Sequence, residues 1–270
     1  MFRILFVGDV FGRPGRHALE RCLKSIKNQY RIDFCIANGE NAAGGRGLNQ
    51  KVAKTLYEYG VDCITLGNHA WDNKNIFTFI DSDPRIVRAY NYPPNLPGRR
   101  FTTLEVRSGL HIVVAQLLGR VFMSHVDCPF RGAEEMLREI GPGKIIFCDV
   151  HGEATSEKVA LGWFLDGKVT AVCGTHTHIP TADERILPMG TAYITDTGMT
   201  GAYDSIIGMN IESVTRQFVT SMKSPFKIAL DNIKVSAVVI TVDETTRKAV
   251  SIERILIPCG CGPCSAERRM

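Results

Sequence analysis

The sequence predicts a mixed α/β fold in which two β-sheets pack face to face with helices on their outer sides. Over the first two thirds of the chain, short β-rich runs alternate with helix-length amphipathic segments, and the remainder is richer in strands. No low-complexity linker and no repeat of fixed period divides the chain. We therefore expect one domain over residues 1–257, followed by a cysteine-containing tail at 258–270.

The predicted strands are short apolar runs bounded by turn residues. Ser108 and Gly109 provide the turn of one hairpin, whose strands are residues 101–106 and 110–118. The other predicted strands cover residues 2–7, 33–37, 61–66, 86–89, 144–150, 169–173, 192–195, 235–242 and 249–257.

Helices are predicted where apolar residues share one face or where a cap is present. In residues 14–27, Leu19, Leu23 and Ile26 are spaced for one buried face. Asn49 can cap a helix that continues to Tyr59. A short helix of about one and a half turns is predicted to start near residue 73. The other predicted helices cover residues 132–140, 153–165 and 212–222.

The composition excludes some partners. The 270 residues carry a net charge of +4 from 32 basic and 28 acidic residues, which is too balanced to indicate binding to nucleic acid or to an anionic membrane. No segment approaches the roughly 20 apolar residues of a membrane span. The first apolar run ends at Gly8 and Asp9, too early for a signal peptide, so we expect a cytoplasmic protein. The sequence leaves homo-oligomer formation open.

The nine cysteines fall into two groups. Most lie within predicted elements and are interpreted as reduced core thiols, notably Cys35, Cys63, Cys148 and Cys173, while Cys22 and Cys128 have no partner nearby in the sequence. Cys259, Cys261 and Cys264 end the chain. They indicate either exposed thiols on a flexible tail or an incomplete zinc site that needs a fourth ligand or a second subunit.

Five predicted strands end in polar residues, usually after a glycine. In open α/β sheets, sites form outside the carboxyl ends of strands, and glycine lets the backbone approach a ligand closely. Any one of these residues could be a cap, a turn residue or a satisfied histidine, but five such ends together indicate a functional site. The residues concerned are Asp9, Glu40, Asn41, Asn68, His69, Asp149, His151, His176 and His178.

The chemistry of these side chains indicates metal ions. Imidazole nitrogens with carboxylate and amide oxygens suit iron, manganese or zinc, and no cysteine is among the candidates. The candidate ligands number seven, too many for one tetrahedral ion and about right for two ions bridged by a carboxylate: Asp9, Glu40, Asn41, Asn68, His151, His176 and His178. Two metal ions roughly 3.5–4 Å apart are a recurring device for phosphoester cleavage.

The order of the motifs resembles that of the calcineurin-like metallophosphoesterases, in which an aspartate comes first and a GHxH motif last. The match is close for GNH at 67–69 and for GTHTH at 174–178. Three positions depart from the pattern. Phe11 stands in place of the first histidine, NGEN replaces GDxxD, and Ala70 stands where an acidic residue would follow GNH.

The sequence at these departures resembles that of one group, the YmdB-like metallophosphoesterases. Six motifs in order carry the resemblance from Met1 to Ile257: GDVFGRPGR, ANGENAAGG, GNHAWD, DVHGEATSEK, GTHTHIPTAD and TDTGMTGAYDSIIGM. The resemblance implies two metal ions. Iron is the metal expected most, and manganese and zinc are the alternatives. It implies that one ion is bound by Asp9, Glu40, Asn41 and His178, and the other by Glu40, Asn68, His151 and His176.

The resemblance also implies that His69 is the general acid. A histidine beside a metal centre suits protonation of a leaving alkoxide, although His69 could instead be structural. Asp149, Glu153, Thr175, Thr177 and Asp196 could orient the histidines without binding metal. Trp71 and Asp72 belong to the GNHAWD motif, and we interpret Trp71 as a packing residue rather than a base-stacking one.

The sequence thus predicts a dinuclear metal-dependent phosphodiesterase. A hydroxide that bridges the metals is expected to attack phosphorus, with His69 as general acid. The resemblance implies 2′,3′- or 3′,5′-cyclic nucleotides as small-molecule substrates. The candidate metal-binding residues by themselves indicate only that the substrate is a phosphoester. Two alternatives stay open, namely a phosphomonoesterase or nucleotidase, and a regulatory, RNA-associated binding protein that retains the metals as structure.

Overall fold

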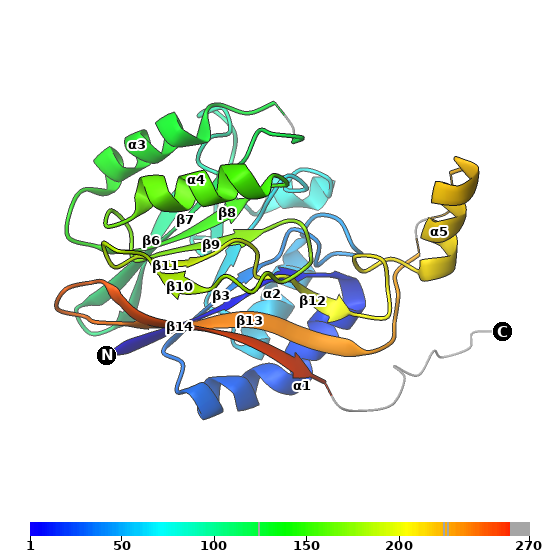
Figure 1. Cartoon of the computed structure of the whole chain (residues 1–270), viewed down its shortest axis with the longest axis horizontal. Helices are drawn as coiled ribbons and strands as arrows, with labels where there is room; N and C mark the ends of the chain where they lie inside the picture. Colours follow the sequence, from blue (N-terminus) through cyan, green and yellow to red (C-terminus); the bar gives the residue numbers. More distant parts are fainter. Residues whose placement is uncertain (124, 224, 226, 260–270) are drawn as a thin grey trace.

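Two β-sheets form the centre of the computed structural model, which describes residues 1–123, 125–223, 225 and 227–259 (Figure 1). One sheet has eight strands in the order β2-β12-β13-β1-β3-β4-β5, with β14 also paired to β13. The other has six strands in the order β10-β11-β9-β8-β7-β6. The bounds of the strands are β1 Phe2–Val7, β2 Asp9–Val10, β3 Phe34–Asn38, β4 Cys63–Thr65, β5 Ile86–Val87, β6 Phe101–Arg107, β7 Leu110–Leu118, β8 Ile145–His151, β9 Ala171–Thr175, β10 Arg185–Ile186, β11 Ala192–Ile194, β12 Met199–Ala202, β13 Ile233–Val242 and β14 Ala249–Pro258.

Helices cover the outer sides of both sheets. Figure 1 shows α1 and α2 beside the eight-stranded sheet, and α3 and α4 over the six-stranded one. The helices are α1 Gly12–Tyr30, α2 Gln50–Tyr59, α3 Pro129–Ile140, α4 Thr155–Leu165 and α5 Ile211–Thr220, with one 3-10 helix, η1, at Lys74–Thr78. Asn49 caps α2 as predicted, since its side chain accepts a hydrogen bond from the Val52 amide at 2.9 Å.

Three large apolar clusters of described residues fill the spaces between these layers. The middle one lies between the sheets, where the rings of Phe6 and Phe147 approach to 4.7 Å between centroids. The outer clusters join α1 and α2 to the large sheet, and α3 and α4 to the small one. The alternating strands and helices predicted from the sequence therefore form the expected two packed mixed sheets.

The parallel strands set the position of the site. In the large sheet β1, β3, β4 and β5 run parallel, and in the small sheet β7, β8, β9 and β11 do so. Their carboxyl ends therefore meet at one edge of the sandwich. In the described part of the chain, no helix is long and apolar enough to span a membrane.

Several predicted elements needed correction. The strand predicted at 169–173 lies at Ala171–Thr175, so it continues into the GTHTH motif. The short strands β2, β10 and β12 were not predicted. The late helix α5 exists, but none of its residues is buried, and Figure 1 shows it standing away from the sheets.

The cysteines of the predicted strands are buried, as expected for core thiols. Cys22 has no partner nearby in the sequence, as predicted, but its Sγ lies 2.8 Å from that of Cys259, which is 237 residues away in the chain. Cys259 thus packs against α1 and its neighbours and is not part of an exposed tail. Cys261 and Cys264, for which a flexible tail or a zinc site was considered, lie outside the described residues.

Candidate metal centre

The polar residues of all five strand ends converge at one place. Asp9 begins β2, just after β1, and His151 is the last residue of β8. Glu40 and Asn41 follow β3, Asn68 follows β4, and the two histidines of GTHTH follow β9. Three strands of the large sheet and two of the small one therefore contribute to the same site.

His151 is the centre of one group of contacts. Its Nε2 lies 2.8 Å from Asn68 Oδ1, 3.2 Å from Glu40 Oε1 and 3.1 Å from His176 Nδ1. The potential ligand atoms of Glu40, His151 and His176 all lie within 4.8 Å of one another. His151 and Glu40 are buried. Four atoms with lone pairs thus surround a single point.

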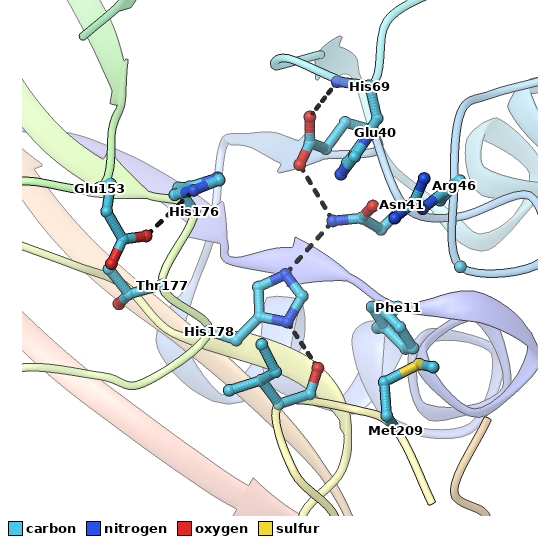
Figure 2. A pocket seen from close by; sticks show the side chains of 12 residues that line it. Phe11, Glu40, Asn41, Arg46, His69, Glu153, His176, Thr177, His178 and Met209 are labelled. Atoms are coloured by element: carbon cyan, nitrogen blue, oxygen red, sulfur yellow. Dashed lines mark hydrogen bonds and ion pairs between the residues drawn. The ribbon is translucent and has the colours of Figure 1, made fainter. Parts of the chain in front are cut away.

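A second group lies on the other side of Glu40. Asn41 Nδ2 is 3.0 Å from Glu40 Oε1 and 3.2 Å from His178 Nε2, as Figure 2 shows. Rotation of the Asn41 amide by 180° would exchange its oxygen and nitrogen, and would present Oδ1 to the same atoms. Asp9 is close enough to His178 and His151 for both rings to influence its pKa. Glu40 therefore lies between two sets of donors.

Hydrogen bonds at the outer ring nitrogens determine which nitrogen of each histidine faces the centre. The single proton of the Thr175 hydroxyl is donated to Asp149 at 2.7 Å, so this hydroxyl accepts from His151 Nδ1 at 2.8 Å. His178 Nδ1 donates to the Ile207 carbonyl oxygen at 2.8 Å. Both rings thereby leave Nε2 free as a ligand atom.

His176 is turned the other way. Its Nε2 lies 3.2 Å from Glu153 Oε2, and a carboxylate can only accept, so Nδ1 is the nitrogen left for the centre. Burial and the nearby His151 lower the pKa of His176 to about 3, which keeps Nδ1 unprotonated. Each of the three histidines therefore directs one ring nitrogen inward, and metal ligation requires these nitrogens to be unprotonated.

The two carboxylates of the centre, Asp9 and Glu40, are buried and need positive charge beside them. Asp9 Oδ1 is buried and has no hydrogen-bond partner among the described residues, and burial raises the pKa of Asp9 to about 6. Burial also acts to raise the pKa of Glu40, but the contact with His151 outweighs it and lowers this pKa to about 2. Against the effect of burial, Glu40 raises the pKa of His151 to about 9. A proton on His151 is thus one cation that these donors can hold, and metal ions fit the same set.

The backbone around the centre is crowded. A Cβ on Gly67 would overlap Glu40 Oε2 and approach His151 Cε1 to 2.7 Å. Glycine is therefore required at this position for Glu40 to occupy its place. This explains the glycine of the GNH motif without invoking a flexible turn.

The backbone of the GTHTH motif is not extended. Residues two apart in an extended segment would point to one side, but His176 and His178 both have left-handed backbones, with φ of 103° and 67°. The two rings converge because tertiary hydrogen bonds hold this conformation. The His176 amide donates to Asp9 Oδ2 at 3.1 Å, and the Thr177 amide donates to Asp196 Oδ2 at 3.1 Å.

A buried ion pair holds the Thr177 segment from behind. Lys158 Nζ lies 2.8 Å from Asp196 Oδ2, and both side chains are at most 2% exposed. The same carboxylate accepts hydrogen bonds from the Thr177 hydroxyl at 2.8 Å and the Gly198 amide at 2.8 Å. Asp196 was predicted to support the histidines, whereas Lys158 was missed, although it belongs to the DVHGEATSEK motif.

We expect Lys158→Met to lower the free energy of unfolding by about 3–5 kcal/mol, because it leaves the Asp196 charge buried without its partner. Denaturant titration measures this loss. The matched control is Lys27→Met, whose pair with Asp62 is 24% and 38% exposed and is expected to contribute about 1 kcal/mol or less. Equal losses in the two variants would contradict the supporting role of the buried pair.

A second buried network lies under His151. Asp149 accepts hydrogen bonds from Thr65 at 2.6 Å, Gln116 at 2.8 Å and Asn38 at 3.0 Å, besides that from Thr175. Asp149 and Thr175 were predicted to orient histidines, and this network shows how they contact His151. Gln116 was missed, although it is the one amide within the apolar run of β7.

His69 lies at the edge of the centre. Its amide donates to Glu40 Oε2 at 2.9 Å, whereas its ring Nδ1 lies 2.8 Å from Asp72 Oδ2. Trp71 stacks on Phe77 with centroids 5.5 Å apart, and it packs against two apolar clusters. The structure thus confirms Trp71 as a packing residue.

A pocket of about 360 Å³ opens over the centre (Figure 2). Ile207 and Met209 contribute apolar surface, and Arg46 contributes a cation. Ile207 and Met209 belong to the last of the six motifs and Arg46 directly follows the second, but no role was predicted for them. The lining consists of Phe11, Glu40, Asn41, Gly45, Arg46, His69, Glu153, His176, Thr177, His178, Ile207 and Met209. His17, His111 and His125, which lie outside the six motifs, are absent from it.

Phe11 packs against His178. Its ring meets that of His178 edge to face, with 5.3 Å between centroids, and is only 4% exposed. The residue that replaces the usual histidine of the first motif is therefore a buried support for His178. Asn41 contacts the same histidine, with its Nδ2 3.2 Å from His178 Nε2.

Solved structures share this architecture. A hypothetical protein from Thermus thermophilus has 42% sequence identity and a TM-score of 0.90, with 95% of this chain and 99% of that chain covered. A structure described as a novel phosphatase from Mycoplasma pneumoniae has 34% identity and a TM-score of 0.89, with 95% and 93% covered. The NAD nucleotidase of Haemophilus influenzae shares the fold alone, at 11% identity and a TM-score of 0.57, with 95% and 56% covered.

Sequence comparison assigns the chain to a family. A curated relative, the 2′,3′-cyclic-nucleotide 2′-phosphodiesterase of Bacillus subtilis (strain 168), is 50% identical over 256 residues, which cover 94% of this chain and 97% of the relative. The family model described as YmdB-like protein matches residues 5–255. The chain therefore belongs to the YmdB-like protein family, as its six motifs indicated.

Proposed function

We propose that this protein is a metal-dependent phosphodiesterase with two metal ions, acting on cyclic nucleotides. The observation that carries the proposal is the inward orientation of three imidazole lone pairs around Glu40, fixed by Thr175, Glu153 and the Ile207 carbonyl. The Bacillus subtilis relative, named as a 2′,3′-cyclic-nucleotide 2′-phosphodiesterase, supports the reaction type.

Each metal ion has its own ligands in this proposal. Asp9, Glu40, Asn41 and His178 would hold the first, and Glu40, Asn68, His151 and His176 the second. Support comes from Glu40 Oε1, which lies within 3.2 Å of both His151 Nε2 and Asn41 Nδ2. When bound, the two ions would supply activation of the attacking water and neutralisation of charge on the phosphate.

His69 would deliver the proton that the leaving group needs. In the reaction, an oxygen from water would bond to phosphorus as the bond between phosphorus and the leaving ribose oxygen breaks. The electron pair of the broken bond would stay on the ribose oxygen, and a proton from His69 Nε2 would move to it. His69 lines the pocket and is positioned through its amide contact with Glu40, so its ring need not bind metal.

The pocket suits a small phosphodiester. Its volume of about 360 Å³ lies within the range of small-molecule sites, roughly 300–1,000 Å³. Ile207 and Met209 offer an apolar wall, and Arg46 places positive charge at the rim. We expect 2′,3′-cyclic nucleotides to be the better substrates, because of the relative, with 3′,5′-cyclic nucleotides as the second class to be tested.

A turnover assay tests the reaction type. The metal-replete protein should hydrolyse 2′,3′- or 3′,5′-cyclic mononucleotides, and should cleave bis-nitrophenyl phosphate faster than mono-nitrophenyl phosphate. The phosphomonoesterase alternative is favoured by the phosphatase description of the Mycoplasma pneumoniae structure, and it predicts the reverse order for the nitrophenyl esters. Inactivity on every ester would instead favour a binding protein.

The protein should contain two metal ions per chain. Elemental analysis after purification without chelator is expected to show iron, manganese or zinc approaching two equivalents. Removal of the ions by a chelator should lower the thermal midpoint, because ligands that bind only the folded state stabilise it. One tightly bound ion with no second site at saturating metal would refute the bridging role of Glu40.

A further inference from the structure

Two cysteines from opposite ends of the chain lie side by side where the last strand meets α1 (Figure 1). Cys22 belongs to α1 and Cys259 follows β14, and their Sγ atoms are 2.8 Å apart. Cys259 Sγ also lies 3.8 Å from the carbonyl oxygen of Ala18, which precedes Cys22 by about one helical turn. The segment after β14 therefore rests on one face of α1, with its thiol against a second thiol.

The sheet and the helix hold this pair in place. β14 runs antiparallel to β13 with Pro258 opposite Lys234, and the Cys259 amide continues the pairing by donating to the Ile233 carbonyl oxygen at 2.9 Å. Both cysteines are half-buried, at the margin of the apolar cluster between α1 and the large sheet. Neither lines the pocket over the metal centre. The pair is thus fixed by the fold, partly open to solvent, and separate from that centre.

The sequence after Cys259 supplies two more thiols. Residues 259–264 read CGCGPC, so Cys261 and Cys264 follow Cys259 at short intervals, the second with the two-residue gap that is common in zinc sites. Successive Cα atoms are only about 3.8 Å apart, so covalent geometry keeps these cysteines within reach of one ion. Glycine is the residue best suited to a tight turn between ligands. Three cysteines are one short of a tetrahedral set, and Cys22 is the fourth.

We propose that a single zinc ion is bound by four cysteine thiolates, those of Cys22, Cys259, Cys261 and Cys264. Structural zinc sites are closed tetrahedra of this kind, and this one would fasten the end of the chain to α1. On binding, the four thiols release their protons to solvent and four Zn–S bonds form, with no transfer of electrons. Zn–S bonds of about 2.3 Å place two ligand sulfurs about 3.8 Å apart, so Cys22 and Cys259 need to separate by only about 1 Å.

A disulfide between Cys22 and Cys259 is the competing outcome. It would require the two sulfurs to approach to about 2.05 Å, and an oxidant to accept two electrons. It would also leave Cys261 and Cys264 without a role, whereas the zinc site uses every cysteine of CGCGPC and needs no oxidant. The number and spacing of the cysteines therefore favour the metal.

Cobalt provides the test, because Co²⁺ can replace zinc in a tetrahedral site and its bonds to thiolate sulfur absorb strongly in the near ultraviolet. Protein kept reduced, stripped of metal and titrated with Co²⁺ should develop this absorption, and added Zn²⁺ should abolish it. The proposed ligands of the dinuclear centre include no cysteine, so cobalt bound there does not contribute. Elemental analysis of zinc-replete protein should show one equivalent of zinc beyond the metal of that centre.

Two variants locate the site, and a third is the control. Cys22→Ser, and a chain that ends at Gly260, should each lose the cobalt–thiolate absorption and one equivalent of zinc. The shortened chain keeps the Cys22–Cys259 pair and the whole described fold, so misfolding would not explain its loss, and only the two equivalents of the dinuclear centre should remain in it. Cys128→Ser, at a half-buried cysteine that precedes α3, should retain both signals. Turnover should be unchanged in all three.

The outcomes that would overturn the inference are distinct from failure of the proposed function. A wild-type protein without the cobalt–thiolate absorption would overturn it, as would absorption that persists in Cys22→Ser or in the chain ending at Gly260. A Cys22–Cys259 disulfide, found by mass spectrometry in protein isolated with zinc and without reductant, would establish the competing outcome. None of these results bears on phosphodiesterase activity, which fails instead if the metal-replete protein hydrolyses no ester.

Discussion

Glu40→Gln is expected to reduce turnover to the rate seen without protein and to weaken both halves of the metal centre. Only two of the seven proposed ligands are carboxylates, Asp9 and Glu40, so the substitution removes half of the negative charge that faces two cations. Glu40 Oε1 also contacts both halves, through His151 and Asn41. Elemental analysis and cyclic-nucleotide turnover at a series of metal concentrations measure the two effects.

Asn41→Ala is the comparison that makes this result specific. Asn41 contacts Glu40 and His178 but is not a proposed ligand of the second ion, so its removal should mainly weaken the first. One equivalent of metal should remain in Asn41→Ala, and considerably less in Glu40→Gln. Equal and mild losses from the two substitutions would mean that neither residue binds metal.

Much of the architecture could be predicted because several central strands are nearly continuous apolar runs. FRILFV and IIFCDVH belong to β1 and β8, which are buried almost throughout, and such runs are typical of parallel strands covered on both faces. The short strands β2 and β12 could not be predicted in this way. They pair through Met199 with Asp9 and Thr200 with Val10, contacts that exist only once the distant segments have met.

The convergence of these residues at the candidate metal centre could be predicted from their positions after strands, but their geometry could not. The sequence places His176 and His178 two residues apart, and an extended backbone was the natural interpretation. Their left-handed conformations depend on hydrogen bonds from this loop to Asp9 and Asp196, which lie on other segments. Tertiary contacts thus override the local pattern at the place where the ligands converge.

The pocket residues were the hardest to predict. Arg46 follows two glycines with left-handed backbones, at Gly44 and Gly45, so its direction depends on a loop rather than on helical or strand periodicity. Ile207 also has a left-handed backbone, and its carbonyl is fixed by His178. Gln116 is different, since a single amide within an apolar strand signals a buried polar contact.

His69→Ala is expected to lower turnover of a cyclic nucleotide by about 10²–10⁴, the usual contribution of a positioned acid. Both metal ions should remain, because the His69 ring is not among the proposed ligands and its structural contact with Glu40 is made by the backbone amide, which alanine retains. Elemental analysis and steady-state kinetics on the same preparation measure the two quantities together.

The leaving group makes this prediction decisive. Nitrophenolate is a weak base and departs without a proton, whereas a ribose alkoxide needs one. The fall should therefore be smaller for bis-nitrophenyl phosphate than for the cyclic nucleotide. His111→Ala is a suitable control, since His111 lies on β7 outside the pocket and should not alter the ratio of the two rates. If His69→Ala loses a metal ion, or slows both substrates equally, His69 is not the general acid, and the proton must reach the leaving oxygen from another group.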